Sequence, residues 1–331
     1  MTRFLTELMS ALPPRSRQDL IAAGVTPGRL RGSGWRTTSR GFFCPRSSGD
    51  DALERRTPTQ RILEALPTLP DGGVLGGWAA AYVHGVDWLD GVGRDGRPEA
   101  VTVVLGCLVD HRPDVPYGYR GLLQPDEAAV RHGVPVTSLE RTAFDCARWA
   151  PNVAEAVVRL DAVLHHTELT APELRDWLPR VKGWRGVRQV RHGLTLADAR
   201  VLSPWESRLR MLMVVTGCLP APEVNVAVRD RRTGALAGFA DLLDSGAGLV
   251  VEYDGAGHRD QVQHHRDNWR EEGLEALGLI VVRVDSLDFR DPYRLLGRIC
   301  AARARGMNRD RSLDRWFIDP QAPLTAALLQ F

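Results

Sequence analysis

The residues that decide the fold of the C-terminal third are Gly238-Phe239-Ala240-Asp241, then Leu249-Val250-Val251-Glu252-Tyr253-Asp254-Gly255, and then His258. One acid stands near the end of a short apolar run, and two more stand at the end of the next run. Two such runs predict two strands joined by a hairpin, which would bring Asp241 and Glu252 to the same edge of a sheet. Clustered carboxylates repel each other, so a fold that keeps them together usually holds a divalent cation between them. The sequence therefore predicts a metal site suited to phosphodiester chemistry.

The residues around these acids predict a domain over residues 198–306, in which a mixed sheet is flanked by helices. Pro204 starts an amphipathic helix, and further helices are expected over residues 261–277 and after Pro292. Strands are predicted at residues 224–228, 236–243, 249–254 and 280–284. The expected order is therefore one helix, three strands, a helix, a fourth strand and a last helix.

This order of elements, with acids at those positions, resembles the PD-(D/E)XK restriction-endonuclease-like superfamily. It is most similar to the branch related to the very-short-patch-repair (Vsr) endonuclease, over the last third of the chain. The matching residues are Glu206, Asp241, Glu252, Tyr253, Asp254, Gly255, His258, Arg266, Asp267, Arg270 and the run 277–284. The resemblance implies a restriction-endonuclease-like domain with nuclease activity.

Three carboxylates are the candidate metal ligands. Asp241 and Glu252 are expected to bind Mg²⁺ or Mn²⁺, and Glu206 to add a ligand or to hold a metal-bound water. Two residues depart from the superfamily pattern: Ala240 replaces its proline, and Asp254 takes the place of the lysine after the second acid. Because a second acid cannot stabilise the attacking hydroxide as a lysine would, one alternative is an inactive nuclease. Another is an acidic strand end that binds no ion.

Further candidate site residues follow the second strand. His258 comes after a Gly-x-Gly turn and is expected to act as a general base or as the acid for the leaving group, because the pKa of histidine is near neutrality. Arg266 and Arg270 stand one helical turn apart and are expected to clamp phosphate oxygens. Asp254 and Asp267 are additional possible members of the site.

The N-terminal residues 1–48 predict a winged helix-turn-helix. Helical spacing, caps and a Thr-Pro start signal predict three short helices within residues 2–31, and a β-hairpin follows at residues 35–43. The arginines expected to contact the phosphates of a nucleic acid are Arg29, Arg31, Arg36 and Arg40. The alternative is a small packing module with a solvated basic face.

An α/β middle domain is expected over residues 59–197, after a linker, and a C-terminal tail over residues 307–331. The middle domain weakly resembles AbiEi-type antitoxin proteins, which pair a winged helix with a second α/β domain; the best local match is the run 133–142. There, Ser138 is expected to cap a helix in which Arg141 and Asp145 form a buried ion pair. The tail is expected to pack on the body of the protein or on a second copy.

Composition restricts the functional classes. The net charge is only +2, yet the residues up to Ser48 contain eight arginines and two acids. The five cysteines form no CxxC pair, and the sequence contains neither a signal-peptide core nor a membrane-spanning stretch, so a cytoplasmic protein is expected. No phosphate-cradling glycine loop follows a strand, so no organic cofactor is expected.

The sequence thus predicts a multidomain α/β protein that acts as a Mg²⁺-dependent DNA endonuclease or nickase and is guided by its N-terminal domain. The alternative is an AbiEi-like antitoxin or transcriptional repressor whose nuclease fold is inactive. A third reading is an interaction scaffold with neither activity. Besides DNA, the possible partners are a second copy of the chain and a toxin, and no membrane is expected as a partner.

Overall fold

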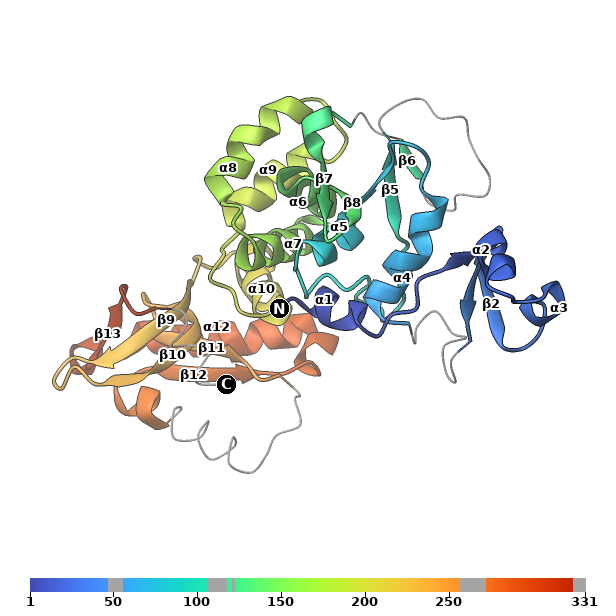
Figure 1. Cartoon of the computed structure of the whole chain (residues 1–331). Helices are drawn as coiled ribbons and strands as arrows, with labels where there is room; N and C mark the ends of the chain where they lie inside the picture. The colour runs from blue at the N-terminus through green and yellow to red at the C-terminus, as the bar shows by residue number, and fades with distance from the viewer. Residues whose placement is uncertain (47–55, 106–117, 121–122, 256–271, 324–331) are drawn as a thin grey trace. The chain divides into compact units, whose positions relative to one another are not determined.

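The chain forms two compact units, each with helices and sheet. The computed structural model describes residues 1–46, 56–105, 118–120, 123–255 and 272–323 (Figure 1). The first unit contains residues 1–151 and 162–195, and the second contains residues 152–161 and 196–331. The prediction of an α/β protein with more than one part is confirmed. Within the described ranges no helix is long and apolar enough to cross a bilayer.

The N-terminal part of the first unit alternates short helices with a small sheet. Its elements are α1 (Arg3–Leu8), β1 (Arg15–Ser16), α2 (Arg17–Ala22), α3 (Pro27–Leu30), β2 (Trp35–Ser39) and β3 (Phe42–Pro45). The side chains of Thr2, Ser16 and Thr26 cap the three helices by accepting backbone hydrogen bonds. The antiparallel sheet has the order β1-β3-β2.

The rest of the first unit is built on a five-stranded sheet of order β6-β5-β4-β8-β7. The strands are β4 (Val74–Gly76), β5 (Thr102–Leu105), β6 (Gly118–Arg120), β7 (Ala128–Arg131) and β8 (Val134–Thr137). The helices are α4 (Pro58–Ala65), α5 (Gly77–Val83), α6 (Leu139–Arg148), α7 (Val153–His166), α8 (Ala171–Trp177) and α9 (Val187–Leu196), with residues 152–161 belonging to the second unit.

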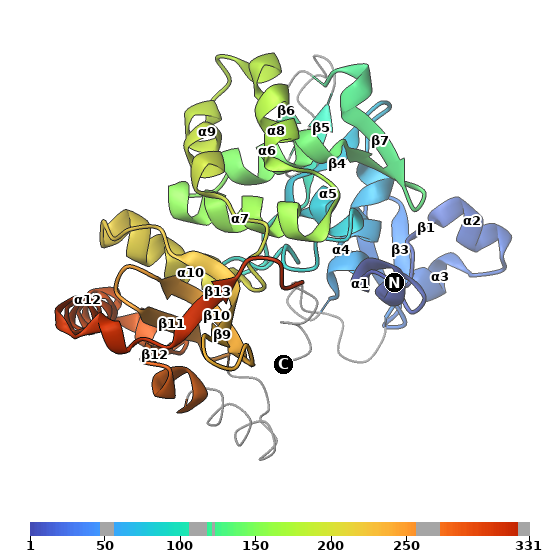
Figure 2. The same cartoon turned by 90° about the vertical axis from the view of Figure 1, so that its left-hand side faces the viewer.

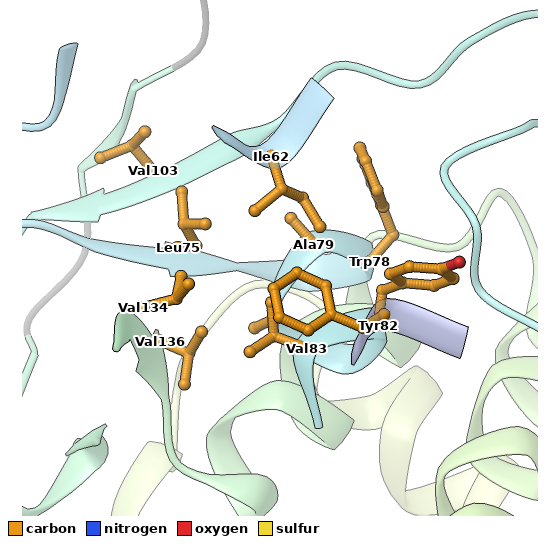
Figure 3. Close-up of a cluster of buried hydrophobic side chains, with 11 residues drawn as sticks. Ile62, Leu75, Trp78, Ala79, Tyr82, Val83, Val103, Val134 and Val136 are labelled. Atoms are coloured by element: carbon orange, nitrogen blue, oxygen red, sulfur yellow. The ribbon is translucent and has the colours of Figure 1, made fainter. Parts of the chain in front are cut away.

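Helix α1 shares the hydrophobic core of the middle region. Phe4 is completely buried and meets Tyr82 edge-on, with ring centroids 6.3 Å apart. Both residues belong to the cluster that contains Ile62, Leu75 and Val136, part of which Figure 3 shows. The N-terminal and middle parts, which we predicted as separate domains, therefore form one unit.

A buried ion network joins α6 to the segment before β7. Ser138 caps α6, and Arg141 donates to Asp145 Oδ2 (2.9 Å) and to Glu127 Oε2 (2.7 Å). Arg148 donates to Asp145 Oδ1 at 2.6 Å. The predicted cap and the predicted buried ion pair are both confirmed.

The second unit is a mixed sheet with helices (Figure 2). Its strands are β9 (Glu223–Asp230), β10 (Leu236–Asp244), β11 (Leu249–Tyr253), β12 (Ile280–Val284) and β13 (Trp316–Asp319), in the order β12-β11-β10-β9-β13. Its helices are α10 (Pro204–Met211), which continues as a π-helical turn over Leu212–Thr216, and α12 (Pro292–Asn308). Strands β11 and β12 are parallel and the other neighbours are antiparallel. The predicted mixed sheet with flanking helices is confirmed.

Residues 316–319 of the predicted tail are part of this sheet, which agrees with the expectation that the tail packs on the body of the protein. Strand β13 pairs antiparallel with β9. Trp316 is buried with Leu274, Leu277 and Val228 in the core of the second unit. The burial of this indole explains why the chain returns to the sheet after α12.

Helix α12 approaches the turn between β10 and β11 so closely that a methyl group does not fit at Gly306. A Cβ atom there would overlap the carbonyl oxygen of Ala247, whereas a Cβ at Gly297 on the same helix would meet nothing within 4 Å. We expect Gly306→Ala to lower the free energy of unfolding by about 1–3 kcal/mol through overpacking. Gly297→Ala is the matched control and should leave stability unchanged or raise it by up to about 1 kcal/mol. Urea denaturation of both variants checks this, and equal stabilities would contradict the close approach.

Candidate active site

A row of buried polar residues crosses the sheet of the second unit. The antiparallel register places Asp241 on β10 opposite Asn225 on β9. Glu252 on β11 lies opposite Asp241, one step beyond the end of the paired ladder. Asn225 is 5% exposed, and Asp241 and Glu252 are each 3% exposed. We call these three residues the polar row, and its two acids occupy neighbouring positions as the sequence predicts.

The carboxylate of Asp241 forms a hydrogen bond with the backbone where β10 and β11 stop pairing. Its Oδ2 accepts a hydrogen bond from the backbone N–H of Tyr253 at 2.9 Å. The side chain thus satisfies a backbone donor where the pairing of β10 and β11 stops. This contact fixes Asp241 beside the end of β11, where the chain presents Glu252.

Helix α10 brings a third acid to the polar row. Ser203 caps this helix by accepting from the N–H of Glu206, and Pro204 occupies its first turn. Glu206 is buried, and its Oε2 accepts from the backbone N–H of Leu202 (3.0 Å) and from Nδ2 of Asn225 (2.8 Å). Because α10 also contacts β10 and β11, the structure brings Glu206 to the row that contains the other two acids.

An aromatic stack holds the start of α10 against the end of β11. The rings of Trp205 and Tyr253 are nearly parallel, with an angle of 9° and centroids 5.4 Å apart. Phe289 packs on Trp205 at 5.0 Å, and Arg208 lies over the indole, also at 5.0 Å. Burial raises the pKa of Tyr253. Trp205 and Tyr253 are the chain neighbours of Glu206 and Glu252, so the stack joins the two backbone segments that carry these acids.

The outer side of α10 is tied down by ion pairs within the second unit. Asp161 is completely buried, and its Oδ2 accepts from Ser207 (2.7 Å) and Arg210 (2.8 Å). Burial raises the pKa of the Asp161 carboxyl, and the guanidinium group of Arg210 opposes that shift. Arg208 donates twice to Glu155, at 2.9 and 3.1 Å. These contacts hold α10 in place through Ser207, Arg208 and Arg210, while Glu206 of the same helix bonds to Asn225 in the polar row.

A Mg²⁺-like ion at this site would be held by two carboxylates, those of Asp241 and Glu252, more readily than by three. Among the residues that the structure describes, no three His, Cys, Asp or Glu side chains are grouped so that they could share an ion. Mg²⁺ is usually bound through one or two carboxylates, with waters and substrate phosphates completing its shell. Asp241 and Glu252 supply such a pair, whereas Oε2 of Glu206 is occupied by two N–H donors. The role of Glu206, as a further ligand or as the group that holds a metal-bound water, stays a prediction.

The remaining predicted members of this site fall in two classes. Asp254 is half-buried just after β11, where its backbone N–H donates to the carbonyl of Val284 at 2.7 Å. His258, Arg266, Asp267 and Arg270 lie outside the described residues, so their proposed roles remain predictions from the sequence.

The arginines predicted to contact nucleic acid divide into three exposed ones and a buried one. Arg29, Arg31 and Arg40 are exposed. Arg36 is buried, and its Nη2 lies 2.6 Å from Oε1 of Glu64 on α4, so its prediction as a phosphate contact is wrong. The inner face of β2 turns this side chain toward α4, where Glu64 neutralises it.

Sequence reasoning missed three residues, two of them on the surface and one in the polar row. Arg15 and Arg17 are exposed beside the small N-terminal sheet, and the only signal for them was the local excess of arginine. Asn225 belongs to the polar row, and the signal for it was a single amide in the otherwise apolar strand 224–228.

Comparison with known proteins finds two partial relatives. Two uncharacterized proteins from two strains of Mycobacterium tuberculosis are each 30% identical to the chain over 158 residues, which are 47% of this chain and 56% of each relative. The chain thus spans about half the length of the curated relatives it matches. No family profile matches the sequence, and no solved structure matches it.

Proposed function

We propose that the protein is a Mg²⁺- or Mn²⁺-dependent phosphodiesterase that cuts or nicks DNA. The observation that carries the proposal is the buried pair Asp241 and Glu252, opposite each other on β10 and β11, with Glu206 of α10 bonded to Asn225 in the same row. Burying several carboxylates in one place is costly unless a cation or hydrogen-bond donors compensate for it. The resemblance of the acid pattern to PD-(D/E)XK nucleases supports the same conclusion.

The residues of the chain divide the work of hydrolysis between them. Asp241 and Glu252 would hold the divalent ion, which when bound activates water and neutralises charge on the scissile phosphate. Glu206, held by Asn225 and Leu202, would orient a water molecule next to the pair. His258 would move the proton, and Arg266 and Arg270 would bind phosphate oxygens.

The N-terminal part is the proposed DNA guide. Its element order, with two helices between the first strand and a β-hairpin, is consistent with a winged helix-turn-helix. Arg29 and Arg31 lie at α3, and Arg40 at the tip of the hairpin, so all three would reach phosphates. Arg15 and Arg17 extend the same exposed basic set.

Incubation of the purified protein with supercoiled plasmid tests the proposal. Nicked or linear DNA should accumulate with Mg²⁺ or Mn²⁺ and should be absent when EDTA is added. Because the substrate class is broad, single-stranded DNA and RNA belong in the same assay. The absence of metal-dependent cleavage on every substrate would overturn the enzymatic proposal.

The second candidate is a DNA-binding repressor or antitoxin whose nuclease fold is inactive, and the exposed arginines of the N-terminal part favour it. It predicts specific binding to the promoter of its own gene, with Asp241→Ala having no effect. A partner toxin encoded by the neighbouring gene would support this candidate over the first.

Both candidates predict that the exposed N-terminal arginines set the salt dependence of DNA binding. The triple variant Arg29→Ala, Arg31→Ala and Arg40→Ala should bind duplex DNA more weakly, because each lost phosphate contact lowers the slope of log K against log salt by about 0.9. Fluorescence anisotropy over a salt series measures the slope. The control is Arg97→Ala, since Arg97 is also exposed but lies in the middle region beside Asp95. Equal slopes for the wild type and the triple variant would contradict the proposed DNA guide.

A further inference from the structure

We propose that the middle region binds the phosphate backbone of duplex DNA through a basic ridge, which consists of Lys182, Arg185, Arg188 and Arg191. The inference rests on the proposed function only in taking DNA as the partner, and it needs no cleavage. It gives the middle region a role of its own, which neither the polar row nor the exposed arginines of the N-terminal part supply.

The basic ridge comes from a stretch of the chain that contains no acid. Residues 177–197 include four arginines and Lys182, the only lysine of the protein, whereas the whole chain has 43 basic and 41 acidic residues. Arg180, near the start of this stretch, pairs with Asp126 at 2.8 Å. The four ridge residues are exposed, and none of them forms an ion pair with another described residue. Four like charges within ten residues, without counter-charges, suit a polyanionic partner.

Helix α9 directs its two arginines outward because its opposite face is buried. The buried residues of this helix are Val187, Val190, Gly193 and Leu194. On the same inner side, the side-chain amide of Gln189 donates to the carbonyl oxygens of Ala147 and Ala150, both at 2.9 Å, at the C-terminal end of α6. Arg188 and Arg191 are three residues apart and therefore neighbours on the outer face.

The turn before α9 is held in place as well. The guanidinium groups of Arg141 and Arg148 lie over the ring of Trp184, at 4.8 and 5.3 Å from its centroid. Gly186 has a φ of 86°, and a Cβ atom there would overlap Arg148. The turn is thus fixed on both sides of Arg185, whose own side chain is exposed. A surface that is ordered before its partner arrives loses less conformational entropy on binding.

The exposed surface of this stretch fits a nucleic acid better than a lipid surface. Helices that lie on membranes expose apolar or aromatic side chains beside the basic ones. Residues 131–214 are all described, and no large hydrophobic side chain among them is exposed. Backbone phosphates, by contrast, are bound largely by arginine and lysine through charge and hydrogen bonds. The basic ridge has these cations and lacks the apolar anchors that a membrane would require.

Fluorescence anisotropy of a labelled DNA duplex over a salt series tests the inference, with EDTA present so that no metal-dependent cleavage occurs. The triple variant Arg185→Ala, Arg188→Ala and Arg191→Ala should make the slope of log K against log salt shallower by about 2.7, because each lost phosphate contact removes about 0.9. Two duplexes of unrelated sequence should be weakened alike, because phosphate contacts carry no sequence information. The variant Arg185→Lys, Arg188→Lys and Arg191→Lys should keep the wild-type slope, because it keeps the charges.

The control removes three positive charges from scattered exposed positions of the chain. It is the triple variant Arg97→Ala, Arg175→Ala and Arg232→Ala, which has the same net charge as the alanine variant of the ridge. We expect this control to bind DNA with the wild-type slope. Because all six substituted side chains are exposed, both alanine variants should unfold at the wild-type temperature.

The outcomes separate this inference from the proposed function. An alanine variant of the ridge with the wild-type slope, a control that loses as much, or a wild type that binds no DNA at low salt would overturn the inference. Loss of binding to an RNA duplex alone would overturn DNA as the partner. Plasmid nicking decides the proposed function independently, since the ridge can bind DNA in a protein that does not cut it.

Discussion

Asp241→Asn should abolish metal-dependent cleavage while leaving the sheet intact. The asparagine side chain keeps an oxygen that can accept from the N–H of Tyr253, which the Asp241 carboxylate now binds at 2.9 Å. What is removed is a negative charge beside Glu252 at the proposed ion site. The loss of one electrostatic contact of this kind costs on the order of 100–1000-fold in turnover, and the loss of an ion ligand should cost at least as much. The rate of plasmid nicking at saturating Mg²⁺ measures the effect.

The control for this substitution is a carboxylate of the same sheet away from the polar row. Asp319 on β13 pairs with Arg229 at 2.8 Å, so Asp319→Asn makes the same chemical change without touching the proposed ion site. We expect this variant to nick DNA at the wild-type rate. If Asp241→Asn nicks as fast as Asp319→Asn, cleavage does not use the polar row.

Arg141→Met should be the most destabilising substitution in the first unit. The guanidinium group of Arg141 is completely buried and neutralises two buried carboxylates, Glu127 and Asp145. Methionine fills a similar space but leaves Glu127 without this counter-charge and Asp145 with Arg148 alone. Breaking a buried ion pair from one side typically costs about 3–5 kcal/mol. Urea denaturation followed by circular dichroism measures the free energy of unfolding.

An exposed ion pair of the same unit provides the comparison. Arg180 pairs with Asp126 at 2.8 Å, and both side chains are largely open to solvent. We expect Arg180→Met to cost less than about 1 kcal/mol, as exposed pairs do. Similar losses of unfolding free energy for Arg141→Met and Arg180→Met would show that the buried ion pairs contribute no more to stability than an exposed pair does.

The parts of the fold that sequence reasoning predicted are those fixed by local chemistry. The apolar runs of the second unit predicted strands at 249–254 and 280–284, and the structure has Leu249–Tyr253 and Ile280–Val284. The cap at Ser138 and the ion pair four residues apart were predicted because both partners lie within one helix. The order and alternation of the two acid-bearing strands were enough to place Asp241 and Glu252 together.

The errors concern contacts between residues far apart in the sequence. Whether Arg36 faces solvent or the interior depends on Glu64, which belongs to another element, so alternation within the hairpin could not decide it. The union of the N-terminal and middle parts depends on Phe4 meeting Tyr82. Strand β13 has only four residues, and its identity depends on a free edge of β9 far earlier in the chain.

The candidate site shows a different limit. The acids were recognised because carboxylates are common metal ligands. The left-handed backbone of Asn225 and its contact with Glu206 depend on the three-dimensional structure, so the sequence could not reveal them. A lone amide in an apolar strand was the available signal. Such a residue is informative because an amide buried in a sheet needs partners, and its partners are then part of the same site.

The position of β13 has a consequence for how the protein is made. Strand β9 lies inside the sheet only because β13 covers its outer side, and β13 is among the last described residues of the chain. While a ribosome is still translating residues 316–319, β9 presents an open row of backbone groups, which is the kind of edge that recruits other chains. Any shortened gene product that stops at residue 306 would keep that edge permanently and would be prone to aggregate, even though every acid of the polar row would be present.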